Sequence, residues 1–352
     1  AVFANARRLY LSKDWLRSRL TGDWHSDFSD AVGALMADVA TGGWSAELCD
    51  LVGWPTERLP PLAAPQAVVG RVTAAAARDC GLVAGTPVVC GSNDTTVEFF
   101  GAGAVRPGQG AIKLATAGVL FLCTEGPRIN PPVSCYPHLL PGLCYTASGT
   151  NSCASAHRWL RDVFFPGESF AAMDELAAAV PPGADGCLFH PYLLGERAPY
   201  WDAKLRARFL GLTMRHGKAH IARATYEGIA FSIRDLRDSS PDRQARFDEI
   251  RLLGGGARSV TWRQVLADVM GVEMVRPANG DASFGAALVA GIGTGVFADA
   301  DDAIARAVRV LDCTAPDAGR VARYDELFGI YKDAQGVLAD IDHRLHRFAH
   351  PG

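Results

Sequence analysis

The chain has 352 residues, of which 49% are hydrophobic and 21% charged, and its formal net charge is −3. This length is sufficient for two domains that each bury a core. The charge balance shows no basic stripe, which argues against nucleic acid as a partner. The longest weakly polar stretch, residues 284–298, is interrupted by glycines and is too short to span a membrane, so we expect no membrane association.

The nine cysteines are scattered singly, without Cys-x-x-Cys pairs or cysteine–histidine clusters at metal-ligand spacing. Such dispersed cysteines are typical of a reducing compartment, so we expect a cytoplasmic protein without a cysteine-based metal site. Cys135 and Cys144 flank a short turn and could meet across a hairpin, but the expected compartment argues against a disulfide.

The first hundred residues are predicted to form short helices around one buried strand. The strand is the apolar run over residues 86–90, and it ends in Gly91-Ser92-Asn93-Asp94. A helix is expected to follow it from Thr95. Further helices are predicted over residues 12–20, 27–37, 44–51 and 74–80.

The segment Arg-Pro-Gly-Gln-Gly over residues 106–110 is the strongest break in the first half of the chain. We place the boundary between two domains here, with the first over residues 1–108 and the second over 109–352. Beyond it, residues 111–122 and 143–148 show the period-two pattern of an antiparallel set of strands. Further strands are predicted over 187–189, 250–253 and 274–275, and helices over 151–164, 219–237, 261–270, 281–293 and 324–348. This alternation indicates an α/β fold with a mostly parallel sheet in the second half.

Asp94 is the first candidate for a catalytic residue. It stands where a strand ends, which is the usual place for ligand contacts in α/β sheets. A carboxylate there could act as the base that activates a hydroxyl for phosphoryl transfer. The alternative is structural, because aspartate is also a preferred N-cap of the helix that begins next.

Two turns of small residues could bind an anion. One contains Thr116 between Ala115 and Ala117, and its alternative is a tight hairpin corner. The other is Gly254-Gly255-Gly256-Ala257 followed by Ser259 and a helix, which is typical of a strand–turn–helix phosphate site. We expect Asp94 to face this glycine turn across a gap between the domains.

The loop over residues 191–202 mixes charged, aromatic and proline residues. It could contact a sugar, but the preferred interpretation is that Arg197 forms an ion pair that stiffens a hinge. On the next helix, Arg223 and Glu227 are four residues apart and are expected to pair for structural reasons.

Many ordered stretches of the chain resemble the FGGY carbohydrate kinases, most closely the xylulokinase branch. Among them are Lys13-Asp14-Trp15-Leu16, Ser26-Asp27-Phe28-Ser29-Asp30-Ala31 and Gly195-Glu196-Arg197-Ala198-Pro199. The resemblance covers nearly the whole chain and includes residues 13–22, 26–31, 85–94, 159–162, 191–202, 209–213, 223–231 and 254–268.

The resemblance implies an α/β fold of two actin-like ATPase domains of the ribonuclease H-like type, with sugar and ATP meeting between them. It implies that Asp94 is the general base and that Asn93 and Thr95 help to bind the sugar. It also implies that the ATP side is formed by Thr116, Ala154, Arg158, Gly254, Gly255, Gly256, Ala257 and Ser259.

The implied reaction is phosphorylation of D-xylulose by ATP with Mg²⁺, giving xylulose 5-phosphate, and no metal ligand is assigned. The alternatives are another acceptor (ribulose, gluconate, glycerol or a tetritol) or a truncated nucleotide- or sugar-binding fragment without activity. A homodimer is left open as the assembly.

Two departures from the family pattern bear on activity. The opening strand pair of the family, with its first phosphate loop and Mg²⁺-associated acid, has no counterpart here, so we expect a first domain incomplete at its N-terminus. The usual Gly-Thr-Ser turn reads Ala115-Thr116-Ala117, which leaves Thr116 as the only side-chain hydroxyl in the turn.

Overall fold

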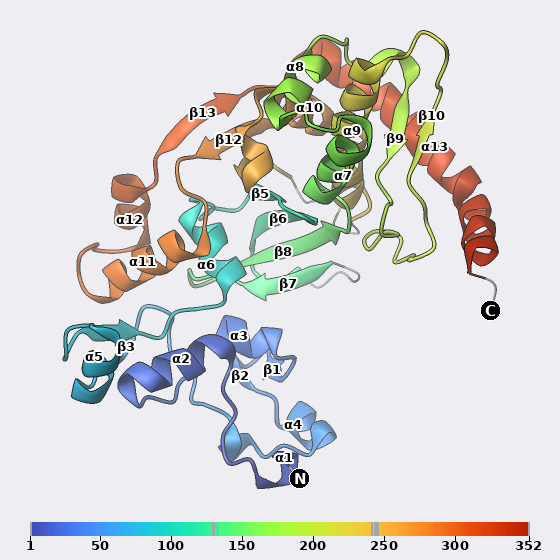
Figure 1. Ribbon diagram of the computed structural model, residues 1–352. Helices are drawn as coiled ribbons and strands as arrows, with labels where there is room; N and C mark the ends of the chain where they lie inside the picture. The colour runs from blue at the N-terminus through green and yellow to red at the C-terminus, as the bar shows by residue number, and fades with distance from the viewer. Residues whose placement is uncertain (1, 129–130, 132, 241, 243–245, 351–352) are drawn as a thin grey trace.

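The computed structural model describes residues 2–128, 131, 133–240, 242 and 246–350. Its elements fall into a smaller N-terminal part and a larger part built on one sheet (Figure 1). Within the described residues, none of the helices combines the length and apolarity that crossing a membrane requires. All nine cysteines, Cys135 and Cys144 among them, are free thiols in the structure.

The N-terminal part contains short helices and two small antiparallel sheets. The sheets pair β1 (Ala37–Asp38) with β2 (Gly43–Trp44) and β3 (Val68–Arg71) with β4 (Pro87–Val89). The helices are α1 (Val2–Asn5), α2 (Ser12–Thr21), α3 (Phe28–Gly33), α4 (Ala46–Val52), η1 (Thr56–Arg58), α5 (Ala74–Cys80) and α6 (Asp94–Gly101).

The larger part is organised around a seven-stranded sheet of order β13-β12-β11-β5-β6-β8-β7. Its strands are β5 (Gln109–Leu114), β6 (Gly118–Glu125), β7 (Ser134–Pro137), β8 (Leu143–Thr150), β11 (Glu249–Leu253), β12 (Glu273–Pro277) and β13 (Val310–Thr314). A separate pair joins β9 (Leu188–His190) to β10 (Arg208–Leu210).

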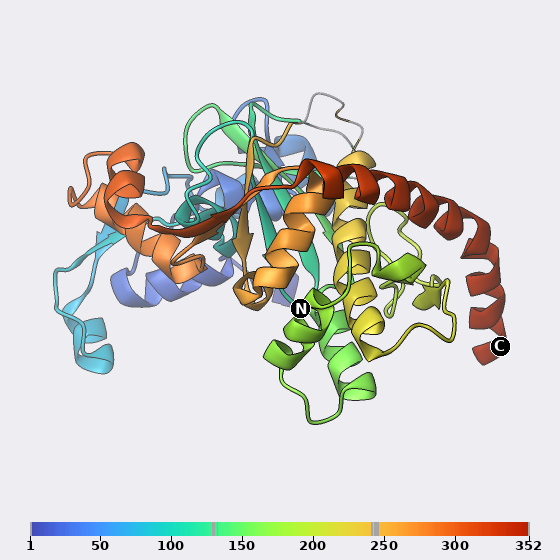
Figure 2. The ribbon, with the colours of Figure 1, turned by 90° about the horizontal axis from the view of Figure 1, so that it is seen from above.

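Helices surround this sheet. They are α7 (Ala154–Phe164), α8 (Phe170–Ala178), η2 (Ala184–Gly186), α9 (Lys218–Asp238), η3 (Gly255–Arg258), α10 (Val260–Met270), α11 (Ala282–Gly293), α12 (Ala300–Ala307) and α13 (Ala318–Ala349). The long helix α13, red in Figure 2, extends along the side of the molecule away from α11 and α12.

The antiparallel set predicted over residues 111–122 and 143–148 is confirmed by the pairing of β6 with β8. The expectation of a mostly parallel sheet was wrong. Only β11 runs parallel to its neighbours, β5 and β12, and the other pairings are antiparallel. The physical reason is connection length, because β5 reaches β6 through the three-residue turn 115–117. A parallel pair needs a crossover of a dozen or more residues.

The sheet is buried on both faces, and the alternation along β5 shows it. Ile112 and Leu114 belong to the large core that includes Leu160, Tyr226 and Leu266 of α7, α9 and α10. Ala111 points the other way, into a second core with Phe99 of α6. Helix α6 therefore covers the face of β5 that α7, α9 and α10 leave free (Figure 1).

Helix α6 also packs closely against α11 from the far end of the chain. A Cβ on Gly285 would lie 1.8 Å from the carbonyl oxygen of Val97, and one on Gly101 would lie 2.8 Å from the Cα of Gly285. Only glycine permits this backbone approach. The crossing fixes α6, and with it Asp94, relative to the larger part of the molecule.

Most predicted elements are confirmed, and the differences are local. The predicted helix 27–37 was too long, since α3 ends at Gly33 and the chain turns through a positive φ at Leu35 before β1. The helix predicted from residue 324 begins earlier, at Ala318. The short elements β3, β7, β10, β13, α1, α8 and α12 were not predicted.

We predict that Gly285→Ala lowers the free energy of unfolding by at least about 2 kcal/mol, because the new methyl group must displace the Val97 carbonyl. The matched control is Gly336→Ala in the exposed part of α13, where nothing lies within 4 Å of the added Cβ. That variant should gain about 0.4–1 kcal/mol. Urea unfolding of both variants checks the pair, and equal effects would contradict this packing argument.

Candidate active site

Asp94 is the first residue of α6, but it is not the cap of that helix. The N-cap is Asn93, whose side-chain oxygen accepts from the backbone N–H of Thr96 at 2.8 Å. The capping alternative for Asp94 was therefore wrong. Its carboxylate is exposed and, within the described residues, accepts from Thr95 alone, from the backbone N–H at 2.7 Å and from the hydroxyl at 3.4 Å. A carboxylate at this position is stabilised by the helix N-terminus and is open to a ligand.

A buried network holds the loop that presents Asp94. Asp27, fully buried, accepts from the hydroxyl of Ser92 at 2.6 Å and from the N–H of Ser29 at 3.1 Å. Ser29 in turn accepts from the side-chain amide of Asn93 at 2.7 Å. The two residues that precede Asp94 are therefore both tied to the start of α3.

Charge surrounds this network. The ammonium group of Lys13 lies 2.6 Å from Asp14, 3.0 Å from Asp27 and 3.2 Å from Asp30. Burial raises the pKa of Asp30 to about 6, an effect that the nearby Lys13 only partly offsets. Arg17 pairs with Asp14 at 3.0 Å. The charged residues of the segments around residues 14 and 27 therefore pair with one another.

The same network reaches the large sheet. The hydroxyl of Thr96 lies 2.8 Å from that of Ser29 and 2.8 Å from the phenol of Tyr145 on β8. Burial raises the pKa of Tyr145 well above its ordinary value, so the phenol stays protonated. Hydrogen bonds thus connect α3, α6 and β8 directly.

The turn with Thr116 lies between β5 and β6, and the start of α7 closes against it. The N–H of Ala154 donates to Ala115 O at 2.8 Å, and the hydroxyl of Ser155 donates to Thr116 O at 2.7 Å. The N–H of Ala154 is therefore used within the protein. The Thr116 side chain is exposed, and Arg158 is exposed one turn further along α7.

The glycine turn lies beside this first turn, since β5 and β11 are parallel and end at the same edge. Gly254 has a φ of 84°, and a Cβ there would lie 2.6 Å from Leu114 O. Gly255 is exposed, Gly256 half-buried and Ala257 buried. Ser259 caps α10, accepting from the N–H of Trp262 at 2.9 Å. The structure thus places the glycine turn next to the turn that contains Thr116.

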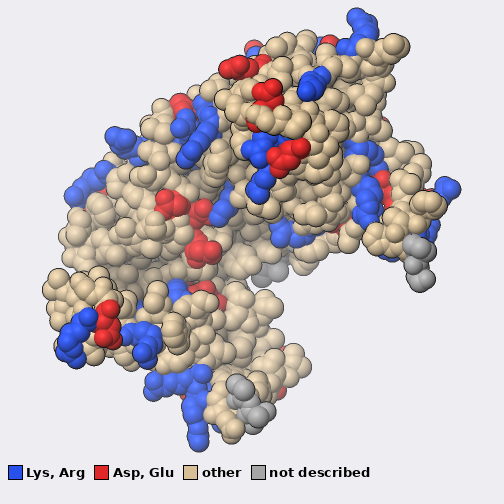
Figure 3. Space-filling model, viewed as in Figure 1, with Lys and Arg blue, Asp and Glu red and all other residues tan. Residues whose placement is uncertain are grey.

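A cavity of about 490 Å³ joins the two sides of the expected site. Thr95, next to Asp94, and Thr116 both line it. The glycine turn opens into a neighbouring pocket of about 210 Å³ lined by Gly254, Ala257 and Arg258. Asp94 itself is not among the residues that line this cavity, although its neighbour Thr95 is, and the expected direct facing of the glycine turn is not seen. The space-filling view shows the molecule hollowed between its lower and upper parts (Figure 3).

Two cationic side chains line this cavity, and one of them, Lys113, was missed by the sequence analysis. Lys113 of β5 lines it and lies 2.6 Å from Glu98 of α6. Arg197 lines it as well, and its Nε donates to Gly149 O at 3.0 Å. A single lysine within the otherwise uncharged strand 109–114 was the available signal.

The loop over residues 191–202 is anchored by Glu196 rather than by an ion pair of Arg197. Buried Glu196 accepts from Thr150 Oγ1 at 2.5 Å and from the N–H groups of Asn151 and Arg197. Burial raises the pKa of this carboxyl group. Arg197 makes no ion pair among the described residues, so its expected hinge role is not seen.

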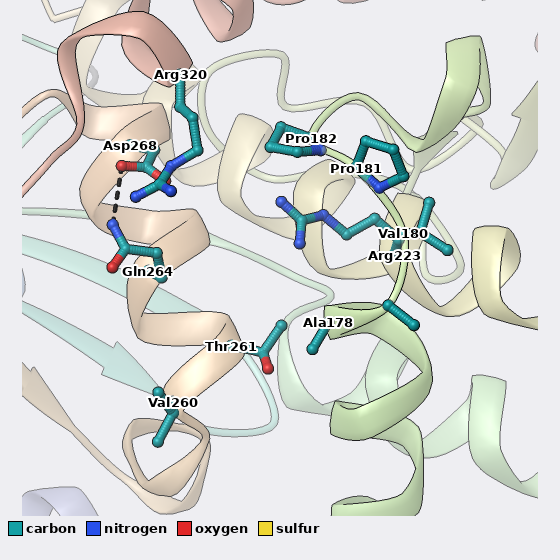
Figure 4. Close-up of a pocket in the computed structure, with 11 residues that line it drawn as sticks. Ala178, Val180, Pro181, Pro182, Arg223, Val260, Thr261, Gln264, Asp268 and Arg320 are labelled. Atoms are coloured by element: carbon teal, nitrogen blue, oxygen red, sulfur yellow. Dashed lines mark hydrogen bonds and ion pairs between the residues drawn. The ribbon is translucent and has the colours of Figure 1, made fainter.

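A second pocket, of about 510 Å³, lies between α8, α10 and α13 (Figure 4). Arg223 faces it but is bound to Glu227 at 2.6 Å, which confirms the predicted pair, and to the phenol of Tyr324 at 2.6 Å. Arg320 is bound to Asp268 at 2.7 Å. Both arginines of this pocket are therefore engaged in ion pairs within the protein.

Mg²⁺ needs oxygen ligands and usually keeps several waters beside substrate phosphates. In the described part of the chain, no group of three or more His, Cys, Asp or Glu side chains could hold a metal ion. Asp94 is an exposed carboxylate whose neighbour Thr95 lines the cavity. The residues present therefore fit an ion that arrives with the nucleotide, not one held by the protein alone.

Comparison with known proteins decides the family. Residues 1–101 match the N-terminal domain and residues 111–294 the C-terminal domain of the FGGY family of carbohydrate kinases. The chain belongs to this family. Its fold is accordingly the α/β fold of two actin-like ATPase domains, and the protein is a carbohydrate kinase by family.

Xylulose kinases are prominent among its relatives. The enzyme of Lactococcus lactis is 31% identical over all of this chain and 71% of its own length, and that of Bacillus subtilis is 29% identical over 99% and 70%. A gluconokinase of Bacillus licheniformis is 27% identical over 96% of this chain and 68% of its own.

Solved structures give the same picture. Xylulose kinase from Rhodospirillum rubrum superposes with a TM-score of 0.87 at 32% identity, covering 97% of this chain and 70% of that one. The ligand-bound xylulose kinase of Lactobacillus acidophilus has a TM-score of 0.89 at 27% identity, covering 96% and 69%. A gluconate kinase from the same organism has a TM-score of 0.88 at 27% identity, covering 96% and 69%.

We predict that Ser92→Ala, which leaves a lone pair of buried Asp27 unsatisfied, costs about 1–3 kcal/mol of stability. It should also reduce catalytic turnover, because the loop before Asp94 loses a tether. Ser18→Ala is the control, since among the described residues that hydroxyl bonds only to Trp15 O, at an exposed site. Its free energy of unfolding should stay within about 0.5 kcal/mol of the wild-type value. Thermal unfolding and initial rates measure both, and unchanged stability of Ser92→Ala would contradict the network.

Proposed function

We propose that this protein transfers the γ-phosphoryl group of ATP to a ketopentose, D-xylulose being the first choice, with Asp94 as general base. The observation that carries the proposal is the position of Asp94. Asp94 is exposed at the start of α6 and does not serve as the N-cap of that helix, and its neighbour Thr95 lines a cavity together with Thr116. The xylulose kinases among the relatives support the choice of sugar.

In this mechanism the sugar lies against Asn93, Asp94 and Thr95, and Asp94 accepts the proton of the attacking hydroxyl. The phosphates lie against the Thr116 turn and the glycine turn, whose exposed backbone can approach them closely. Arg158 and Ser259 flank the nucleotide. The bound Mg²⁺ supplies charge neutralisation on the phosphates, while the protein supplies position and donors.

The reducing-compartment argument supports a cytoplasmic enzyme, because all nine cysteines are free in the structure. Gluconate is the second acceptor to consider, because gluconokinases also match nearly the whole chain. A kinase for gluconate would use the same base and the same phosphate turns.

The function is tested by measuring ADP formation from ATP and Mg²⁺ with no acceptor, and then with D-xylulose, D-ribulose, gluconate, glycerol and a tetritol. We expect D-xylulose to raise the rate most. Preference for gluconate would shift the substrate and keep the enzyme class. ADP formation unaffected by every acceptor would overturn the proposal.

We predict that Asp94→Asn lowers kcat by about 100- to 10,000-fold, the usual contribution of a general base. The Kd for ATP should change little, because the phosphates are held elsewhere. Asp317→Asn is the matched control, since Asp317 caps α13 and asparagine caps equally well. Steady-state rates and nucleotide titrations measure both variants, and near-normal turnover of Asp94→Asn would rule out this base.

A further inference from the structure

Lys113 occupies a defined position between the two sides of the proposed site. It shares the face of β5 that carries Ala111, so its side chain extends toward α6. There its Nζ lies 2.6 Å from Glu98 Oε2. Glu98 is one helical turn after Asp94 on α6. The ammonium group of Lys113 is therefore held by an ion pair to α6, the helix that begins with the proposed base.

The lysine has donor capacity left for a ligand. An ammonium group has three N–H donors, and Glu98 accepts one of them. No second partner of Lys113 is found among the residues that the structure describes. Its side chain is 36% exposed, whereas that of Glu98 is 10% exposed. The carboxylate is thus enclosed while the ammonium group reaches the cavity.

The cavity around Lys113 is the one that Thr95 and Thr116 share. In the proposed mechanism, this cavity is the space between the Thr116 turn and Thr95, the residue next to Asp94. Arg197, whose Nε is fixed to Gly149 O, adds a second cation to the same wall.

We propose that Lys113, held by Glu98, binds the transferred phosphoryl group through its ammonium and stabilises the charge in the transition state. The inference rests on the proposed kinase function and adds a catalytic residue to it. A strand lysine oriented by a helix glutamate performs a comparable task in protein kinases, where the lysine contacts nucleotide phosphates. Fixing the ammonium in advance is what makes such a charge effective.

The turn over residues 115–117 has few side-chain donors, which is why a nearby cation such as Lys113 matters for binding a phosphoryl group. Ala115 and Ala117 offer no side-chain donor, so Thr116 is the only hydroxyl of the turn. A cation two residues before this turn supplies charge that the turn itself lacks. Because the charge is near the transferred group rather than the adenosine, it should act on turnover more than on nucleotide binding.

The experiment compares Lys113→Met, Lys113→Arg and the double variant Glu98→Gln/Lys113→Met in the whole chain. Lys113→Met should lower kcat by about 100- to 1,000-fold, the effect of removing one transition-state donor. The KM for the sugar should stay within about threefold, because the sugar contacts remain, and Lys113→Arg should restore part of kcat because it keeps the charge. Lys113→Met alone would leave the carboxylate of Glu98 buried without its partner, and the double variant removes that charge. If the double variant is stable and loses kcat to a similar extent, misfolding is excluded as the cause. Lys204→Met, at an exposed position, is the control for charge removal and should have normal kcat.

A binding measurement separates catalysis from structure. The Kd of Mg·ADP should be unchanged in Lys113→Met, whereas the Kd of ADP with aluminium fluoride and sugar, which imitates the transferred phosphoryl group, should rise at least about 100-fold, as kcat falls. If Lys113→Met keeps kcat within threefold of the wild type, or binds the fluoride complex normally, the inference is overturned. If the wild type itself shows no acceptor-dependent ADP formation, the proposed function fails first. The ratio of affinities for ATPγS and ADP in the two proteins then still decides whether Lys113 contacts the terminal phosphate.

Discussion

The close backbone approach of Gly285 to Val97 is the constraint on which the site depends, because it fixes helix α6 against α11. Helix α6 carries Asp94 at its first turn and Glu98 at its second. Its opposite side covers the large sheet through Phe99. A helix held on two sides by packing presents its N-terminal residues in one place, and this is what a positioned base requires.

Buried hydrogen bonds also hold the loop that precedes α6. The buried bonds from Asp27 to Ser92 and from Ser29 to Asn93 hold the loop just before α6. Unsatisfied buried polar groups are costly, so this network has few alternative arrangements. It orders the backbone at Asp94 without occupying the carboxylate of Asp94 itself, which leaves that group open to a substrate.

The two phosphate-side turns come together for a topological reason. The turn at Thr116 and the turn at Gly254 are about 140 residues apart along the chain, but they follow strands β5 and β11, which pair in parallel register. The carboxyl ends of parallel neighbours lie at one edge of a sheet, where ligands of α/β proteins bind. The antiparallel strands β6, β7 and β8 extend the sheet on the side of α6 and bring Tyr145 into the network.

The sequence by itself determined the family, the class of fold and most helices and strands, and it indicated the residues that we propose for both ends of the site. Apolar periodicity, turn residues and ordered motifs are local properties that survive in one dimension. The tertiary structure alone decided that Asn93 rather than Asp94 caps α6, that the sheet is mixed, and that Lys113 meets Glu98 across a strand–helix contact. Those outcomes depend on which segments pack together, and the competition between neighbouring polar side chains for one N–H is settled only by that packing.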